Sequence, residues 1–171
     1  MSPCTQGQSL WRVLLSSKAG LVFIVTFFWA SLSLASAQSQ DVTPPILTAL
    51  SFTPTTIDTS SGPADVAVSV SATDDLSGIR VVEVDFMSPS DTQGRGAGSD
   101  FSPSPPTNLS ATLNATFPQF SEAGTWTVAQ VVLIDAVGNR RTYSTAELAQ
   151  LGFPTDLVVR GQAEDVTLHR I

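Results

Sequence analysis

Acidic residues in turns are the feature of this sequence that most directly suggests chemistry. Asp74 and Asp75 stand together in one turn, Asp135 and Asn139 bound a second, and Asp41 precedes a pair of prolines. Carboxylate and amide oxygens are hard ligands, and Ca²⁺ binds about six to eight such oxygens in flexible sites. The same residue types also cap the backbone of their own turns. The sequence therefore predicts either a calcium site or a set of backbone caps at these five residues.

Catalytic chemistry is poorly supported. His169, the only histidine, stands two residues from the end of the sequence, where a rigid scaffold for nucleophilic catalysis is not expected. No glycine-rich phosphate loop and no His/Cys spacing typical of zinc is present. Trp126 is expected in the core, which leaves little aromatic surface for stacking on sugar. We predict that the chain is not an enzyme, and a carboxylate-based hydrolase is the least favoured alternative.

Residues 1–37 have the pattern of a cleavable signal peptide. Arg12 and Lys18 precede an apolar run over 19–34, and Ala35-Ser36-Ala37 then provides a small-x-small cleavage site. The alternative is an uncleaved membrane anchor, but the run of 16 residues is shorter than the ~20 that a spanning helix needs. We therefore expect cleavage after Ala37 and an exported product that is secreted, periplasmic or attached to the cell surface.

Charge and cysteine content limit the partners of the exported chain. All 15 acidic residues follow Ala37, against six arginines and no lysine, so the product is more acidic than the precursor with its net charge of −7. Nucleic acid and anionic membranes are bound through basic surfaces, so the acidic charge opposes binding to either. No stable membrane insertion is expected once the signal peptide is removed. The only cysteine, Cys4, would leave with the signal peptide, so a hydrophobic core rather than disulfides must stabilise the domain.

Short alternating apolar and polar runs between Pro, Gly, Asp and Ser clusters predict strands. The predicted fold is all-β, an immunoglobulin-like antiparallel sandwich of about seven strands over residues 38–160, with a polar tail over 161–171. A bulge near Ala129-Gln130 is needed to keep the alternation in phase. Residues 88–107 are expected to form a long loop with a short edge strand, and a short helix is expected near 145–151. The expected strands are Ile46–Phe52, Asp65–Thr73, Ile79–Met87, Leu109–Phe117, residues 124–134, Arg140–Tyr143 and Leu157–Val159.

Four motifs give the chain a family resemblance. They are Asp41-Val42-Thr43-Pro44-Pro45, Ala72-Thr73-Asp74-Asp75-Leu76-Ser77-Gly78, Gly124-Thr125-Trp126-Thr127-Val128 and Asp135-Ala136-Val137-Gly138-Asn139. In this order they resemble the bacterial immunoglobulin-like modules of exported and surface proteins. The resemblance covers about residues 41–159, and it implies a non-catalytic role in adhesion, in spacing of an assembly, or in binding a protein or glycan at the cell surface. Such modules usually occur in tandem, whereas this sequence holds one copy.

An immunoglobulin-like topology would bring the acidic turns together. The first strand starts at the pole where the second ends and the third begins, and the strand ending at Ile134 reaches the same pole. Asp41, Asp74, Asp75, Asp135 and Asn139 are therefore expected to converge. Two functions remain open: an interaction or spacing module without metal, and a structural or adhesion module stabilised by calcium.

The predicted processing is directly testable. Because the small-x-small site follows a short apolar run, exported protein should begin at Gln38. N-terminal sequencing or intact mass measures this. Recovery of the full-length chain, extracted only with detergent, would show instead that the apolar run is a membrane anchor.

Overall fold

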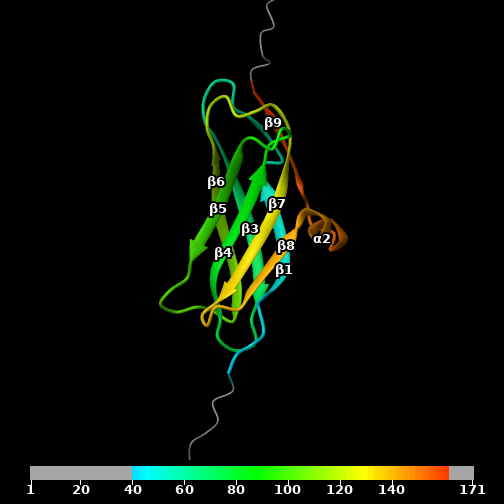
Figure 1. The fold of residues 1–171 in the computed structure, drawn as a ribbon. Coiled ribbons are helices and arrows are strands. Elements are labelled where there is room, and N and C mark those ends of the chain that lie inside the picture. Colours follow the sequence, from blue (N-terminus) through cyan, green and yellow to red (C-terminus); the bar gives the residue numbers. More distant parts are fainter. Residues whose placement is uncertain (1–39, 162–171) are drawn as a thin grey trace, which may run out of the picture. The chain divides into compact units, whose positions relative to one another are not determined.

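Alternating apolar and polar side chains place the strands in two mainly antiparallel sheets that pack against each other. The structure is a computed structural model that describes residues 40–161, so the predicted signal peptide and His169 lie outside the described residues. One sheet has the strand order β1-β3-β6, and the other has the order β2-β9-β7-β4-β5 with β8 also paired to β7 (Figure 1). The elements are β1 (Ile46–Thr53), β2 (Thr56–Asp58), β3 (Ala64–Thr73), β4 (Ile79–Met87), β5 (Gly94–Asp100), β6 (Asn108–Phe117), β7 (Gly124–Asp135), β8 (Arg140–Ser144), α2 (Thr145–Gln150) and β9 (Asp156–Arg160).

This arrangement confirms the predicted all-β sandwich with one short helix. One sheet contains β1, β3 and β6, which correspond to strands A, B and E of an immunoglobulin-like sandwich. In the other sheet, β4, β5, β7 and β8 correspond to strands C, C′, F and G. The described part has nine strands rather than about seven. The additional strands are β2, which pairs in parallel with β9, and β5, the edge strand expected within residues 88–107.

The core lies between the two sheets. The inward residues of β3 and β4 alternate with exposed or half-buried ones, as the sequence pattern predicts. A chain of edge-to-face aromatic contacts runs between the sheets: Phe52 meets Phe86 at 5.5 Å between ring centroids, Phe86 meets Phe117 at 5.8 Å, and Phe117 meets Trp126 at 5.0 Å. Trp126 is fully buried, which confirms its expected place in the core.

The predicted bulge in β7 is present. Asp85 pairs with Gln130 but the next residue, Phe86, pairs with Val128, so Ala129 is the additional residue on β7. The bulge keeps Val128 and Val131 both buried, which strict alternation across one strand would forbid. It thereby extends the apolar face along the whole length of β7.

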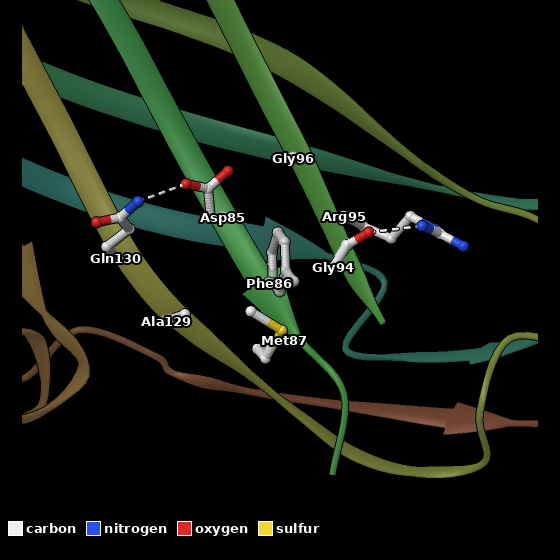
Figure 2. A pocket seen from close by; sticks show the side chains of 8 residues that line it. All are labelled: Asp85, Phe86, Met87, Gly94, Arg95, Gly96, Ala129 and Gln130. Carbon is white, nitrogen blue, oxygen red and sulfur yellow. Dashed lines mark hydrogen bonds between the residues drawn. The ribbon is translucent and has the colours of Figure 1, made fainter. Parts of the chain in front are cut away.

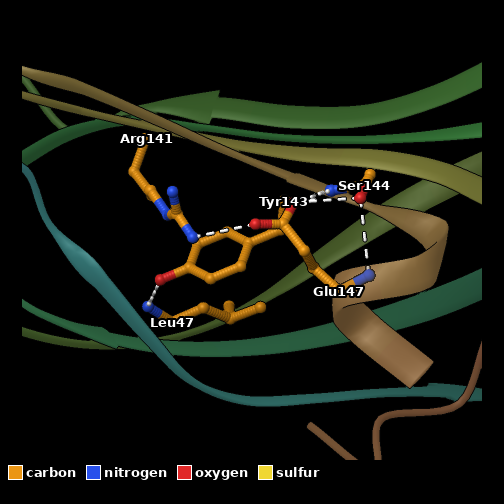
Figure 3. A network of polar contacts seen from close by, with 5 residues as sticks. All are labelled: Leu47, Arg141, Tyr143, Ser144 and Glu147. Atoms are coloured by element: carbon orange, nitrogen blue, oxygen red, sulfur yellow. Dashed lines mark hydrogen bonds and ion pairs between the residues drawn. The ribbon is translucent and has the colours of Figure 1, made fainter. Parts of the chain in front are cut away.

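A polar network fixes the edge at which β8 and β1 approach each other (Figure 3). The Leu47 amide donates to the buried Tyr143 hydroxyl at 3.0 Å, which links the two sheets. The Arg141 guanidinium lies 4.8 Å from the centroid of the Tyr143 ring and pairs with Glu147 at 3.0 Å. Glu147 and Ser144 form a capping box at the start of α2. The network therefore joins β1, β8 and the helix.

Removing the Tyr143 hydroxyl tests this link between the sheets. In Tyr143→Phe the Leu47 amide stays buried without its acceptor, so we expect the free energy of unfolding to fall by about 1–3 kcal/mol. Urea unfolding of the two proteins measures the loss. Equal stabilities would show that the hydroxyl is not needed to join the sheets.

Candidate metal centre

Three segments meet at one end of the sandwich. The chain enters β1 there, the turn over residues 74–78 connects β3 to β4, and the turn over residues 136–139 connects β7 to β8 (Figure 1). The Ala136 amide donates to the Gly78 carbonyl at 2.9 Å, which joins the two turns directly. We call this end the acidic pole, because each of the three segments carries an aspartate: Asp41, Asp74 and Asp135.

The three aspartates form one group. Each offers a carboxylate oxygen, and these oxygens all lie within 4.8 Å of one another. Two oxygens on opposite sides of a Ca²⁺ ion would be about 4.6–5.2 Å apart, since Ca–O distances are about 2.3–2.6 Å. The oxygens therefore fit within the coordination sphere of a single calcium ion. Asp135 is completely buried, and Asp41 is 8% exposed.

Asp135 is anchored by its own turn. Its Oδ1 accepts hydrogen bonds from the backbone amides of Val137, Gly138 and Asn139, at 3.0, 2.6 and 2.7 Å. Gly138 has φ +101°, a conformation that glycine adopts without strain. The carboxylate is thus held rigidly whether or not a cation is bound, and the predicted role as a backbone cap is confirmed for this residue.

Asp74 uses only one of its two carboxylate oxygens. Its Oδ2 accepts from the Gly78 amide at 2.6 Å and from the Leu76 amide at 3.2 Å. The other oxygen, Oδ1, is shielded from solvent and has no hydrogen-bond partner. A buried carboxylate oxygen without a partner destabilises the folded state, because the oxygen loses its hydrogen bonds to water and forms none within the protein. A cation bound among the three carboxylates would supply the missing interaction.

Asp41 ties the segment before β1 to the pole. Its Oδ2 accepts from the Ser77 amide at 2.9 Å, and its Oδ1 accepts from the Thr43 amide at 3.1 Å. The adjacent Ser77 side chain and then these amides hold the pKa of Asp41 below its usual value of 3.8, against the opposing effect of burial. The Ser77 hydroxyl itself completes no hydrogen bond in the structure, so we attribute the effect mainly to the two amides.

Asn139 lies among the carboxylates, but its amide nitrogen faces them. Nδ2 donates to Asp135 Oδ2 at 2.6 Å and to the Asp41 carbonyl at 3.3 Å. In this orientation Asn139 is a neutral bridge between two segments. A rotation of the amide by half a turn would present Oδ1 to a cation, and it would break both of these hydrogen bonds.

Asp75 stands apart from the group. It is exposed, whereas its neighbour Asp74 is partly buried. Of the five residues predicted as ligands, the structure brings together Asp41, Asp74, Asp135 and Asn139 and leaves Asp75 outside the three-carboxylate group. Adjacent residues in a turn point in different directions, and the sequence pattern did not distinguish which of the two faces inward.

Among residues 40–161, no basic side chain forms an ion pair with an aspartate of the pole. Across residues 40–161 the one ion pair is Arg141–Glu147, which lies on the surface beside α2. Like charges held close together repel, and burial strengthens the repulsion. The seven backbone amides that donate to the three aspartates oppose it in part. A divalent cation would oppose it further.

A hollow lies on the outer face of the sheet formed by β4, β5 and β7 (Figure 2). Its carboxylate, Asp85, accepts a hydrogen bond from Gln130 at 2.8 Å. Gly94 and Gly96 form one side, so β5 offers no outward side chain there. The Asp85 carboxylate is thus the only one lining this hollow, and acid–base catalysis by a carboxylate pair would need a second.

Comparison of the sequence with protein-family models and with characterised proteins gives no match. The resemblance to bacterial immunoglobulin-like modules therefore remains an expectation from the four motifs. Within residues 40–161, no helix is long and apolar enough to cross a membrane.

The lowered pKa of Asp41 predicts acid sensitivity. A carboxyl group whose pKa is lower in the folded state stabilises that state above its unfolded pKa, near 3.8, and loses the contribution as pH falls through the folded value. The free energy of unfolding should therefore decline below pH 3.8, and it should decline less steeply in Asp41→Asn. Urea unfolding over a pH series measures both slopes. Identical slopes would show that Asp41 makes no such contribution.

Proposed function

We propose that this chain is an exported, non-catalytic β-sandwich module that calcium stabilises at the acidic pole, and that serves in adhesion or in spacing an assembly. Two observations carry the proposal: Asp74 belongs to a group of three carboxylates, and its Oδ1 atom is buried without a hydrogen-bond partner. Backbone capping explains the hydrogen bonds of the group, but it gives no reason to bury this oxygen without a partner.

The donor set suits a hard cation. The group offers three carboxylate oxygens, and Asn139 would add a fourth oxygen after rotation of its amide. Water would complete the about six to eight ligands that calcium takes. The chemistry of a zinc site, which favours sulfur and imidazole, is not offered by these residues.

The role of such a cation would be structural. Asp41, Asp74 and Asp135 are separated by long stretches of sequence, so an ion bound by all three would cross-link the segment before β1 to two turns. A ligand that binds only the folded state raises stability by mass action. Export supports this function, because extracellular calcium modules bind at about 10⁻⁴–10⁻³ M, a range that fits calcium-rich surroundings.

Two adjacent substitutions test the site. Wild-type protein should melt about 5–10 °C higher in about 10 mM calcium than in excess chelator. Asp74→Asn should abolish this response, because its amide oxygen can still accept from the turn while its NH₂ replaces the free Oδ1. The metal-free Asp74→Asn protein should be at least as stable as metal-free wild type, since one negative charge is removed from the group.

Asp75→Asn is the matched control, since it removes the same charge from the next residue of the same turn. It should retain the full calcium response. Identical melting curves of the wild type in calcium and in chelator would reject the proposal. Loss of the response in both variants alike would show that calcium acts through general charge rather than through this group.

A further inference from the structure

Exposed apolar side chains are concentrated around the acidic pole. Seven large apolar residues are exposed in the described part of the chain, and four of them adjoin the aspartate group. We call these four the apolar rim: Val42, Ile46, Leu76 and Val137. Ile46 belongs with the others because it pairs with Thr73, the residue before Asp74.

The rim is built into the same turns that hold the carboxylates. The Leu76 amide donates to Asp74 and the Val137 amide donates to Asp135, so these backbones face inward. Their side chains are nevertheless 52% and 61% exposed, and that of Val42, next to Asp41, is 73% exposed. Each aspartate-bearing segment thus presents a carboxylate to the pole and an aliphatic side chain to solvent.

From this juxtaposition we propose that the acidic pole docks onto an anionic, phosphate-bearing lipid surface when calcium is bound. The inference rests on the proposed calcium site. Calcium would offset two of the three negative charges of the group and offer its remaining coordination positions to a lipid phosphate. The apolar rim would enter the boundary between headgroups and acyl chains. Interfacial binding grows with buried apolar area and with attraction to anionic lipids, so the two contributions reinforce each other.

The charge at the pole makes this docking depend on the cation. Without it, the pole carries the charges of the exposed Asp75 and of the three clustered aspartates. The nearest basic residues in sequence are Arg80 and Arg140. Such a pole repels lipid phosphates. Bound calcium would offset two of these four negative charges, while the four aliphatic side chains stay exposed.

A lipid surface fits the rim better than a protein partner does. Protein interfaces depend on a few buried anchors, mostly Trp, Tyr and Arg set in complementary pockets. The rim consists only of aliphatic side chains, and no aromatic residue lies in residues 41–46, 74–79 or 135–140. Separate aliphatic protrusions around a charged centre suit a fluid surface that needs no matching pocket.

Flotation with vesicles tests the proposal. Exported wild-type protein should bind vesicles of phosphatidylcholine and phosphatidylglycerol in millimolar calcium and remain unbound in chelator. The double variant Leu76→Ser/Val137→Ser keeps every charge, and its apparent affinity should fall at least about tenfold, since two aliphatic side chains no longer leave water. Val42→Ser, a second variant at a highly exposed position, should also bind more weakly.

Leu151→Ser/Val158→Ser is the matched control, because it removes two exposed apolar side chains outside the rim. It should bind as the wild type does. Equal binding by the rim and control double variants would overturn the proposal, since attraction would then come from charge alone. A calcium-dependent self-association of the protein without vesicle binding would also overturn it, in favour of a protein partner.

Melting temperatures separate this inference from the proposed function. If calcium raises the melting temperature of wild type and of Leu76→Ser/Val137→Ser equally, the site is intact in both, and vesicle binding then tests the rim by itself. A wild type that calcium stabilises but that never binds vesicles would reject lipid docking and leave the calcium site standing. A wild type that calcium does not stabilise would reject the calcium site.

Discussion

Burial of one apolar face from each sheet is the constraint on which the rest of this structure depends. The aromatic contacts from Phe52 through Phe86 and Phe117 to Trp126 alternate between the two sheets, so they fix how the sheets face each other. Once the faces are fixed, the strand directions determine where every turn must lie. Three segments distant in sequence are thereby brought to one pole, and their aspartates are brought together as a consequence of packing.

Backbone capping and cation binding are complementary roles for these aspartates. The amides that donate to Asp135 and to Asp74 Oδ2 hold the carboxylates in position before any ion arrives. Such preorganisation lowers the ordering cost of binding. What capping does not account for is Asp74 Oδ1, and this oxygen is where the two interpretations differ. A set of caps would function equally well with Asn at position 74, whereas a calcium site would not.

Much of the fold could be predicted from the sequence, because alternation records which face of each strand is buried. The valines of β3 and the bulge at Ala129 follow directly from that pattern. The pole at which the aspartates meet follows from the immunoglobulin-like topology expected for these strands. The strands β2 and β5 were harder to place. β2 has only three residues, and β5 alternates glycine with other residues, so neither has the apolar period that identifies a strand.

The details of the candidate site depend on the directions of side chains within turns. Unlike side chains of a strand, those of a turn follow no repeating sequence pattern, so their directions cannot be predicted from it. Asp74 and Asp75 have the same chemistry and are adjacent, yet only Asp74 joins the group. The exposure of Leu76 and Val137 could not be predicted from the sequence either, because an aliphatic residue in a turn can pack into the core or point to solvent. The signal that could have identified them is their position one or two residues after each aspartate, shared with Val42.

Nuclear magnetic resonance during a calcium titration tests the central claim most directly, because the amides that cap the carboxylates report on the site itself. The account predicts saturable shifts of the Ser77, Gly78 and Gly138 amide resonances with one common dissociation constant. The amides around the exposed Glu83 should shift little. Small, non-saturating shifts spread evenly over all exposed carboxylates would contradict the account, since calcium would then be only a counterion of an acidic surface.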